Sequence, residues 1–238
     1  MRRIAAVAVV ALIAGCGGGS SSQSTTAPAK TSSPSGGVVT AEPTKGILAP
    51  AIGIDDGKIV ITGKGGAISP KEDRPTDAQE HGVAGSGACA STSSNPSPSN
   101  LGRMSAAILC LLNAERRSQG LSSLHSNGKL RNAAKGWAKR MVAGRFFAHE
   151  AGSSTLLSRV KRTGYVSGNW SIGENIAWGS GALATPRAIV NGWMHSAGHR
   201  ANILHGKFRD IGIGIKLGAP GAGLSGGATY VTDFGRHG

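Results

Sequence analysis

The chain has 238 residues and a formal net charge of +14, and all of its aromatic residues lie at or after Trp137. Residues 103–238 carry 18 Lys and Arg against 5 Asp and Glu, so the excess positive charge belongs almost entirely to the C-terminal part. No segment reaches the roughly 20 apolar residues of a membrane-spanning helix, which excludes a polytopic membrane protein.

Residues 1–15 have the pattern of an export signal. Two arginines precede an apolar run that extends from Ile4 to Ala14 and is too short to cross a bilayer. The run ends in Ile-Ala-Gly-Cys, which resembles the end of a bacterial lipoprotein signal. We therefore expect cleavage before Cys16, lipidation of its thiol and anchoring to the outer face of the membrane. An ordinary signal with a chance cysteine is the alternative, and both place the protein outside the cytoplasm.

Export also bears on the other two cysteines, Cys89 and Cys110. Disulfides form and persist in an oxidising compartment, so we expect these two residues to pair. Two free, buried thiols are the alternative. The pairing would tie the end of the N-terminal segment to the first helix of the domain that follows.

The basic charge has to be interpreted in the same compartment. A basic surface often indicates a nucleic-acid binder, but nucleic acid is not the common partner outside the cell. We expect no nucleic acid as partner, and instead anionic lipid headgroups or anionic wall polymers. A solvated basic face without a partner is the alternative.

Composition divides the rest of the chain into two parts. Residues 16–100 are rich in Gly, Ser and Pro and are expected to form a tether. Within this tether, isoleucines alternate around an Asp-Gly pair at 51–62, which predicts a hairpin that needs another surface to pack on. Residues 101–238 are long enough for one globular domain.

The elements of this domain follow from periodicity and capping residues. Apolar residues at helical spacing over 130–141 predict a helix ending at Gly144, and glycine-laden strands are expected at 211–217 and 228–234 as an antiparallel hairpin. The glycines of the first strand would let another element approach its backbone closely. Helices first and strands last favour an α+β layered domain. The other helices are expected at 105–119, from a Thr155 cap to Gly164, and from a Thr185 cap through Met194.

Strong catalytic signatures are missing from the sequence, including GxSxG, HExxH, the Walker loop and the dinucleotide fingerprint. The remaining candidates are His149 after the second helix, Glu174 in a domain poor in acidic residues, and two residues of WMHSAGHRANIL (193–204). In that stretch Ser196 is placed to cap a helix that begins one residue later. The cap would turn His199 away from His195, so we do not expect this histidine pair to bind a metal.

Six motifs occur along the domain in the order LLNAERRSQGL, FFAH, GENIAWG, GWMHSAGHRANIL, FRDIGIGI and YVTDFG. Together they resemble the bacterial, SCP-like branch of the CAP superfamily, named after cysteine-rich secretory proteins, antigen 5 and pathogenesis-related 1 proteins. The resemblance covers about residues 105–236. It implies an α+β fold, a three-layer α-β-α sandwich with a central antiparallel sheet.

The resemblance also implies a central cleft with two histidines and two acidic residues, often able to bind a divalent metal. By position, His149 and His199 match the histidines and Glu174 matches the first carboxylate. Ser196 stands where the second carboxylate is expected, so these positions cannot supply a pair of carboxylates for acid–base catalysis. The metal expectation is Zn²⁺ or another divalent ion on the two histidines. A buried hydrogen-bonded network without metal is the alternative.

Three classes of function remain open from the sequence. The first is a non-enzymatic extracellular module that binds a lipid, a wall polymer or a protein in the cleft. The second is a metal-assisted hydrolase, such as a peptidase, and the third is a structural envelope protein. The missing carboxylate and the basic surface favour the binding module. Ser196 lies at a capping position and is a poor candidate for a nucleophile, which counts against the hydrolase.

Overall fold

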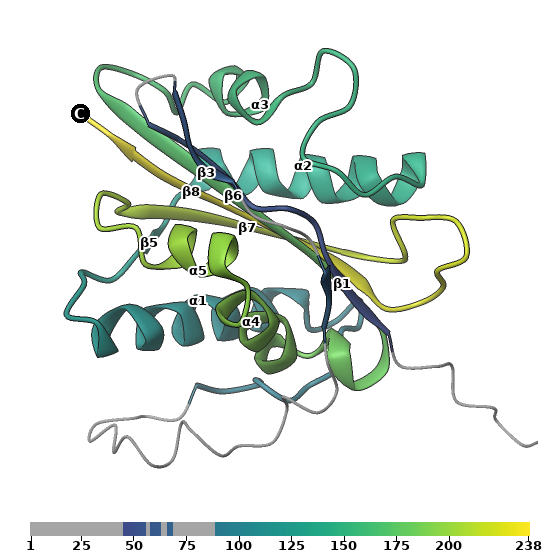
Figure 1. Ribbon diagram of the computed structural model, residues 1–238. Helices are drawn as coiled ribbons and strands as arrows, with labels where there is room; N and C mark the ends of the chain where they lie inside the picture. The colour runs from purple at the N-terminus through teal and green to yellow at the C-terminus, as the bar shows by residue number, and fades with distance from the viewer. Residues whose placement is uncertain (1–44, 56–57, 63–65, 69–88) are drawn as a thin grey trace, which may run out of the picture. The chain divides into compact units, whose positions relative to one another are not determined.

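The computed structural model describes residues 45–55, 58–62, 66–68 and 89–238. The predicted export signal and Cys16 lie outside these ranges. The described residues form a mixed sheet with helices on both faces, which confirms the predicted α-β-α sandwich (Figure 1). None of the helices described is long and apolar enough to span a membrane.

Strands dominate the two ends of the described chain, and helices lie mostly between them. The strands are β1 (Gly46–Leu48), β2 (Ile52–Asp55), β3 (Lys58–Thr62), β4 (Gly66–Ala67), β5 (His125–Ser126), β6 (Trp170–Gly179), β7 (Asp210–Leu217) and β8 (Ala228–His237). The helices are α1 (Leu101–Ser118), α2 (Gly128–Gly144), α3 (Leu156–Arg162), the short 3₁₀ helix η2 (Gly181–Ala184), α4 (Pro186–Met194) and α5 (Ala197–Ile203).

The sheet has the strand order β3-β2-β6-β8-β7-β5, and β1 pairs with both β6 and β4. The described strand pairs are antiparallel except for β5 and β7, which pair in parallel. Strand β6 was not predicted, although it lies at the centre of the sheet. The registers of β8 with β6 and with β7 place Asp233 between Glu174 and Gly212.

Helix α2 lies against the face of β7 and β8, and the predicted glycines explain how closely. A Cβ atom at Gly212 would lie 2.0 Å from the carbonyl carbon of Leu130, and one at Gly214 would lie 2.3 Å from that of Ala134. Only glycine leaves room for a helix backbone at these distances. The predicted close approach at the first strand is therefore confirmed.

The opposite face of the sheet carries α1, α4 and α5 (Figure 1). Their core includes Trp193 and Phe208, both of which are almost completely buried. Arg116 of the first motif is also fully buried, and it donates to the carbonyls of Ile203 at 2.7 Å and Phe208 at 3.1 Å. Because guanidinium protons need acceptors when buried, this residue ties α1 to the segment between α5 and β7.

Several local predictions are confirmed, and one boundary is shifted. Thr155 and Thr185 cap α3 and α4 through their side chains, and Cys89 is bonded to Cys110 with the Cα atoms 5.8 Å apart. The first helix begins at Leu101, four residues before its predicted start at Ser105.

Strands β1 to β4 come from the segment expected to be a tether. Strands β2 and β3 pair antiparallel within the predicted hairpin at 51–62, and β2 also pairs with β6. The turn residues 56–57 lie outside the described ranges. The sheet therefore includes residues from before position 101, while the predicted domain boundaries themselves remain a prediction.

Candidate functional site

Glu174 lies at the centre of a buried polar network on β6. Its Oε1 is 2.6 Å from His149 Nδ1 and its Oε2 is 2.6 Å from Arg159 Nη2, while its side chain has no exposure. Burial alone would raise the pKa of this carboxyl, but Arg159 and then His149 outweigh burial and hold the pKa below its ordinary value. Glu174 is therefore ionised, and both of its oxygens are engaged.

Arg159 holds the histidine segment in place as well as the carboxylate. Its Nη1 donates to the His149 carbonyl at 2.7 Å, and its guanidinium lies 3.8 Å from the ring centroid of Trp137. Trp137 in turn donates from Nε1 to the Ala148 carbonyl at 3.0 Å. These contacts position His149 from helices α2 and α3, which explains why a residue in a loop reaches β6 with defined geometry.

The ring of His149 is engaged at both nitrogens. Nδ1 faces the Glu174 carboxylate, and Nε2 contacts the carbonyl oxygen of Pro50. Both partners are acceptors, so the arrangement is complete when both ring nitrogens carry protons. While both contacts are kept, neither ring nitrogen offers a free lone pair.

His199 is placed in the same region by α5, and its side chain is fully buried. Its Nδ1 is 2.8 Å from Ser196 Oγ, and its Nε2 has no hydrogen-bond partner among the described residues. Burial first, and the positive charge of His149 second, lower the pKa of His199 to about 4, with the Ala49 backbone acting weakly in the opposite direction. The ring is therefore neutral at physiological pH.

The structure corrects the role expected for Ser196. The residue is at the N-cap position of α5 as predicted, but its side chain makes no capping hydrogen bond. Its hydroxyl is directed to the His199 ring instead, which competes with capping. His195 is exposed and its Nδ1 faces the Asn191 carbonyl at 2.9 Å, so the two histidines of this stretch do not face each other.

Asp233 is a second buried carboxyl group that the sequence reasoning missed. It is the cross-strand neighbour of Glu174 and has no exposure. Burial and then the Glu174 charge raise the pKa of Asp233 well above its ordinary value, against a smaller opposing effect of Arg159. Asp233 is therefore expected to stay protonated.

The residues around Glu174 do not fit a metal ion in this arrangement. Both nitrogens of His149 and both oxygens of Glu174 are engaged, and His199 offers only Nε2. A catalytic zinc site needs three protein ligands. Within the described ranges, no group of three or more His, Cys, Asp or Glu residues is arranged to hold a metal.

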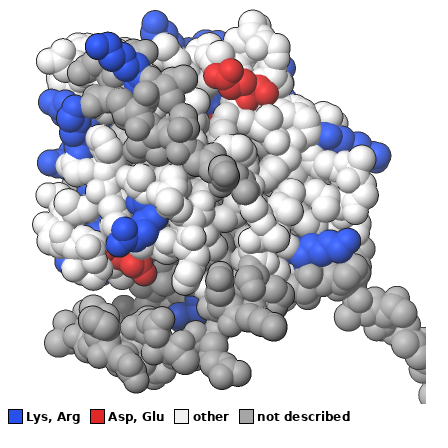
Figure 2. Space-filling view, in the orientation of Figure 1, with Lys and Arg blue, Asp and Glu red and all other residues white. Residues whose placement is uncertain are grey.

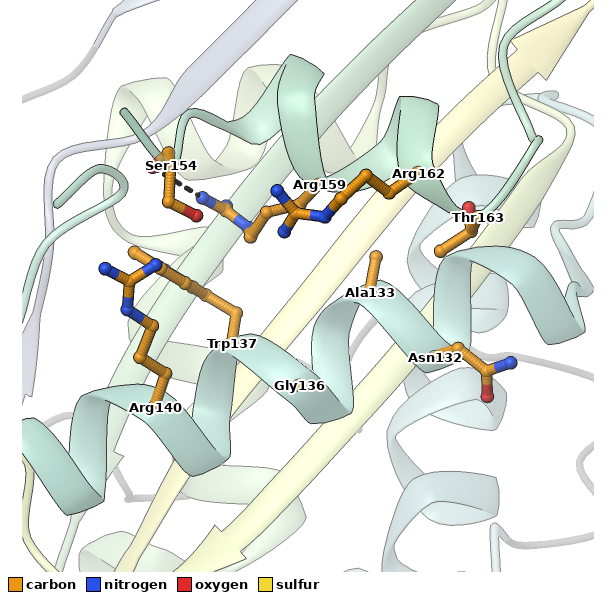
Figure 3. Close-up of a pocket in the computed structure, with 9 residues that line it drawn as sticks. All are labelled: Asn132, Ala133, Gly136, Trp137, Arg140, Ser154, Arg159, Arg162 and Thr163. Atoms are coloured by element: carbon orange, nitrogen blue, oxygen red, sulfur yellow. Dashed lines mark hydrogen bonds between the residues drawn. The ribbon is translucent and has the colours of Figure 1, made fainter. Parts of the chain in front are cut away.

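A pocket of about 240 Å³ opens between α2 and α3, and Arg159 is part of its lining (Figure 3). Two polar atoms of its lining, Ser154 Oγ and Arg159 Nε, are buried without a hydrogen-bond partner. The lining includes three arginines and no acidic residue. It consists of Asn132, Ala133, Gly136, Trp137, Arg140, Ser154, Arg159, Arg162 and Thr163.

Two bacterial relatives share part of their sequence with this chain. "Uncharacterized protein YkwD" of Bacillus subtilis (strain 168) is 34% identical over 120 residues, which cover 49% of this chain and 44% of the relative. "Uncharacterized membrane protein YlbC" of the same organism is 30% identical over 108 residues, which cover 45% of this chain and 30% of the relative. The matches thus span less than half of either relative.

Solved structures and a family model were also compared with the chain. An outer surface protein from Borrelia burgdorferi has a TM-score of 0.46 and 19% identity, over 54% of this chain and 89% of that one. An extracellular protein containing an SCP domain from Bacillus anthracis str. Ames has a TM-score of 0.44 and 24% identity, over 58% of this chain and 44% of that one. The model of the cysteine-rich secretory protein family, CAP, matches residues 109–232, which is just over half of the chain. The chain belongs to the cysteine-rich secretory protein (CAP) family.

Proposed function

We propose that this protein is an exported binding module that recognises an anionic phosphate group of a lipid headgroup or a wall polymer in the pocket between α2 and α3. The name of the family, which describes secretory proteins, and the Cys89–Cys110 disulfide support export. Lipidation at Cys16 would hold the module at the membrane surface, where such groups are abundant.

The observation that carries the proposal is the pair of unsatisfied donors in the pocket. Arg159 is fixed by Glu174 and Trp137, so its Nε–H is held in one direction. Among the described residues, neither this Nε–H nor the Ser154 hydroxyl has a hydrogen-bond partner. A buried donor without an acceptor costs about 1–3 kcal/mol. Phosphate oxygens would satisfy both donors, and Arg140 and Arg162 line the same pocket.

The charge of the outer surface supports the same class of ligand. Of the five acidic residues after position 102, Glu174 and Asp233 are fully buried. The surface of this part of the chain is therefore more basic than the sequence count suggests. Figure 2 shows Lys and Arg side chains at several places on one face and few acidic side chains. Such a surface attracts anionic polymers and headgroups before any specific contact forms.

Calorimetric titration of the full chain with inorganic phosphate tests the site. Ser154→Ala and Arg162→Gln should each weaken binding, by about tenfold for loss of a charged hydrogen bond. Arg131→Gln removes the same charge from an exposed position of α2 outside the pocket and serves as the control. Equal weakening by Arg162→Gln and Arg131→Gln would mean non-specific attraction and would overturn the proposal.

Two retention assays distinguish a lipid headgroup from a wall polymer as the source of the phosphate group. Retention on vesicles of anionic phospholipid, but not on isolated cell wall, indicates a headgroup; the reverse indicates a wall polymer. In both arms Ser154→Ala should reduce retention more than Arg131→Gln does. Retention on neither material, even at low salt, contradicts the function.

A hydrolase is the second candidate, because Ser196 Oγ and His199 Nδ1 lie 2.8 Å apart. A serine nucleophile needs a histidine oriented by a third group at its other nitrogen, and no described side chain accepts a hydrogen bond from Nε2 of His199. We therefore expect a fluorophosphonate probe not to label the protein. Labelling that disappears in Ser196→Ala would favour the hydrolase.

A further inference from the structure

Residues 45–55 form a strap that runs antiparallel along β6 and covers the histidines of the site. Gly46 to Leu48 lie opposite Gly179 to Ala177, and Ile52 to Asp55 lie opposite Glu174 to Ser171. At the far end, the Ser180 N–H donates to the Lys45 carbonyl at 2.8 Å. The strap precedes the part of the chain that matches the CAP family, residues 109–232. It is therefore an addition to the domain that occupies a strand position beside β6.

The strap is not a regular strand where it crosses the site. Between the pairs Leu48↔Ala177 and Ile52↔Glu174, three strap residues lie opposite only two residues of β6. The extra residue makes a bulge at Ala49-Pro50-Ala51, and bulges tolerate proline because it has no N–H to contribute to the ladder. The bulge turns the Pro50 carbonyl toward Nε2 of His149.

Three polar side chains of the site meet backbone groups of the strap. His149 contacts the Pro50 carbonyl, and Asn202 Nδ2 donates to the Ile52 carbonyl at 3.0 Å. His199 lies close enough to the Ala49 backbone for that backbone to affect its pKa. All of these contacts are to the main chain, which any extended polypeptide presents. Recognition of main-chain groups beside a sheet edge is how peptides bind by strand addition.

The two alanines of the bulge are small and enclosed, whereas Pro50 is exposed. Ala49 is 2% exposed and Ala51 is 3% exposed. Ala49 packs with Trp137 and Ile176 in one core cluster, and overpacking such a position is destabilising. The groove therefore selects small residues around the proline, in addition to reading the main chain.

We propose that β6, His149, His199 and Asn202 form a binding site for an extended peptide segment with small residues flanking a proline, and that the strap is its built-in occupant. This site is separate from the phosphate pocket and goes beyond the function proposed above. Because the strap is tethered, its effective concentration is on the order of millimolar, so a partner peptide binds only when it outcompetes the strap or when the strap is displaced.

The test uses the full chain with the strap displaced by a charge. Ala49→Asp places a carboxylate in an enclosed apolar position, whereas Ala67→Asp makes the same change at an exposed residue of β4 and is the matched control. Hydrogen exchange of β6 should become faster in Ala49→Asp alone, while exchange of α2 stays slow. Phosphate binding is compared in Leu48→Ala and the wild type, because Leu48 lies in a different core cluster from Trp137 of the phosphate pocket. It should be the same in both, which separates this proposal from the proposed function.

The probe is a fluorescein-labelled peptide of residues 45–55, KGILAPAIGID, followed by fluorescence polarisation. We expect binding to Ala49→Asp and none to the wild type or to Ala67→Asp below about 100 µM. Adding His149→Leu to the displaced chain should weaken binding about tenfold by removing one donor to the peptide carbonyl. A peptide with Asp at the position of Ala49 should not bind.

Leu48→Ala is the milder variant in case Ala49→Asp does not fold, since Leu48 is a buried strap residue whose truncation leaves the bulge intact. Faster exchange of β6 without peptide binding would overturn the proposal, as would equal binding of a second peptide with the same residues in scrambled order. The proposal would also be overturned if, in both Ala49→Asp and Leu48→Ala, the strap is released only when α2 unfolds. The strap would then be an integral strand of the domain.

Discussion

Glu174→Gln and Asp233→Asn make the same chemical change at two cross-strand neighbours, and we expect them to affect stability in opposite ways. Glu174→Gln removes the negative charge that faces Arg159 and His149 in a fully buried position. Removing one partner of a buried ion pair costs about 3–5 kcal/mol, because the remaining charge is left without compensation. We expect the free energy of unfolding to fall by that amount at neutral pH.

Asp233→Asn should not destabilise the protein at neutral pH. The pKa of Asp233 lies well above 3.8 in the folded chain, so the folded state keeps a proton that the unfolded state releases above pH 3.8. Retaining that proton costs the wild type about 1.4 kcal/mol per pH unit between the unfolded and the folded pKa. Asparagine has no proton to retain, so the stability of Asp233→Asn relative to wild type should rise at that rate with pH.

Urea unfolding followed by tryptophan fluorescence measures both effects, with the disulfide intact and at a series of pH values. The slope of each transition is measured as well as its midpoint, and a common slope allows the midpoints to be converted to free energies of unfolding. An equal loss of stability in both variants, without the predicted pH trend for Asp233→Asn, would mean that Asp233 is ionised. The description of the buried pair would then be wrong.

Three further predictions concern pH, packing and the disulfide. The pKa of His199 is lowered from 6.5 to about 4, so the contribution of its neutral ring to the free energy of unfolding is complete above pH 6.5 and is lost as pH falls toward 4. The loss reaches about 3 kcal/mol, and acid titrations of stability should show that it is absent in His199→Gln. Gly214→Ala should lower the free energy of unfolding by about 3 kcal/mol or more through collision with the α2 backbone, whereas Gly102→Ala, with nothing within 4 Å of its Cβ position, should cause no loss. Replacing Cys89 and Cys110 by serine should cost about 3 kcal/mol in the same urea assay, and an unchanged midpoint would contradict a stabilising role.

The part of the fold that was predicted from sequence is the part with local signals. Helix α2 has a clear apolar period, and α3 and α4 begin at threonine caps. Strand β6 has no period of two because it is buried on both faces, and its polar residues Glu174 and Asn175 lie inside the buried network. A pattern that depends on one exposed face could not reveal it.

The site was predicted only where the family resemblance named its positions. His149 and Glu174 are in contact as expected, but Arg159 follows no local signal, because an arginine in a basic helix normally faces solvent. Asp233 was visible in the last motif, yet its position beside Glu174 depends on the register of β6 with β8. Long-range pairing of this kind cannot be deduced from the spacing of residues along one chain.

The strap is the clearest example of a long-range contact that could not be predicted from the sequence. Its isoleucines predicted a hairpin, and the need for a packing surface was recognised, but nothing in the sequence indicated β6 as that surface. The contact of Pro50 with His149 joins residues 99 positions apart in the chain. Main-chain recognition leaves no mark on the sequence of the strap beyond its small side chains.

The proposed binding of an anionic phosphate group through Arg159, in the pocket beside the Glu174 network, can be observed directly. Nuclear magnetic resonance of the full chain with isotope-labelled arginine can follow the Arg159 Nε–H group directly while inorganic phosphate is added. We predict a saturating shift of this signal and protection of its proton from exchange with water, with smaller changes at Arg131. An Arg159 signal that does not move, or that moves only as much as the signal of Arg131, would contradict the claim.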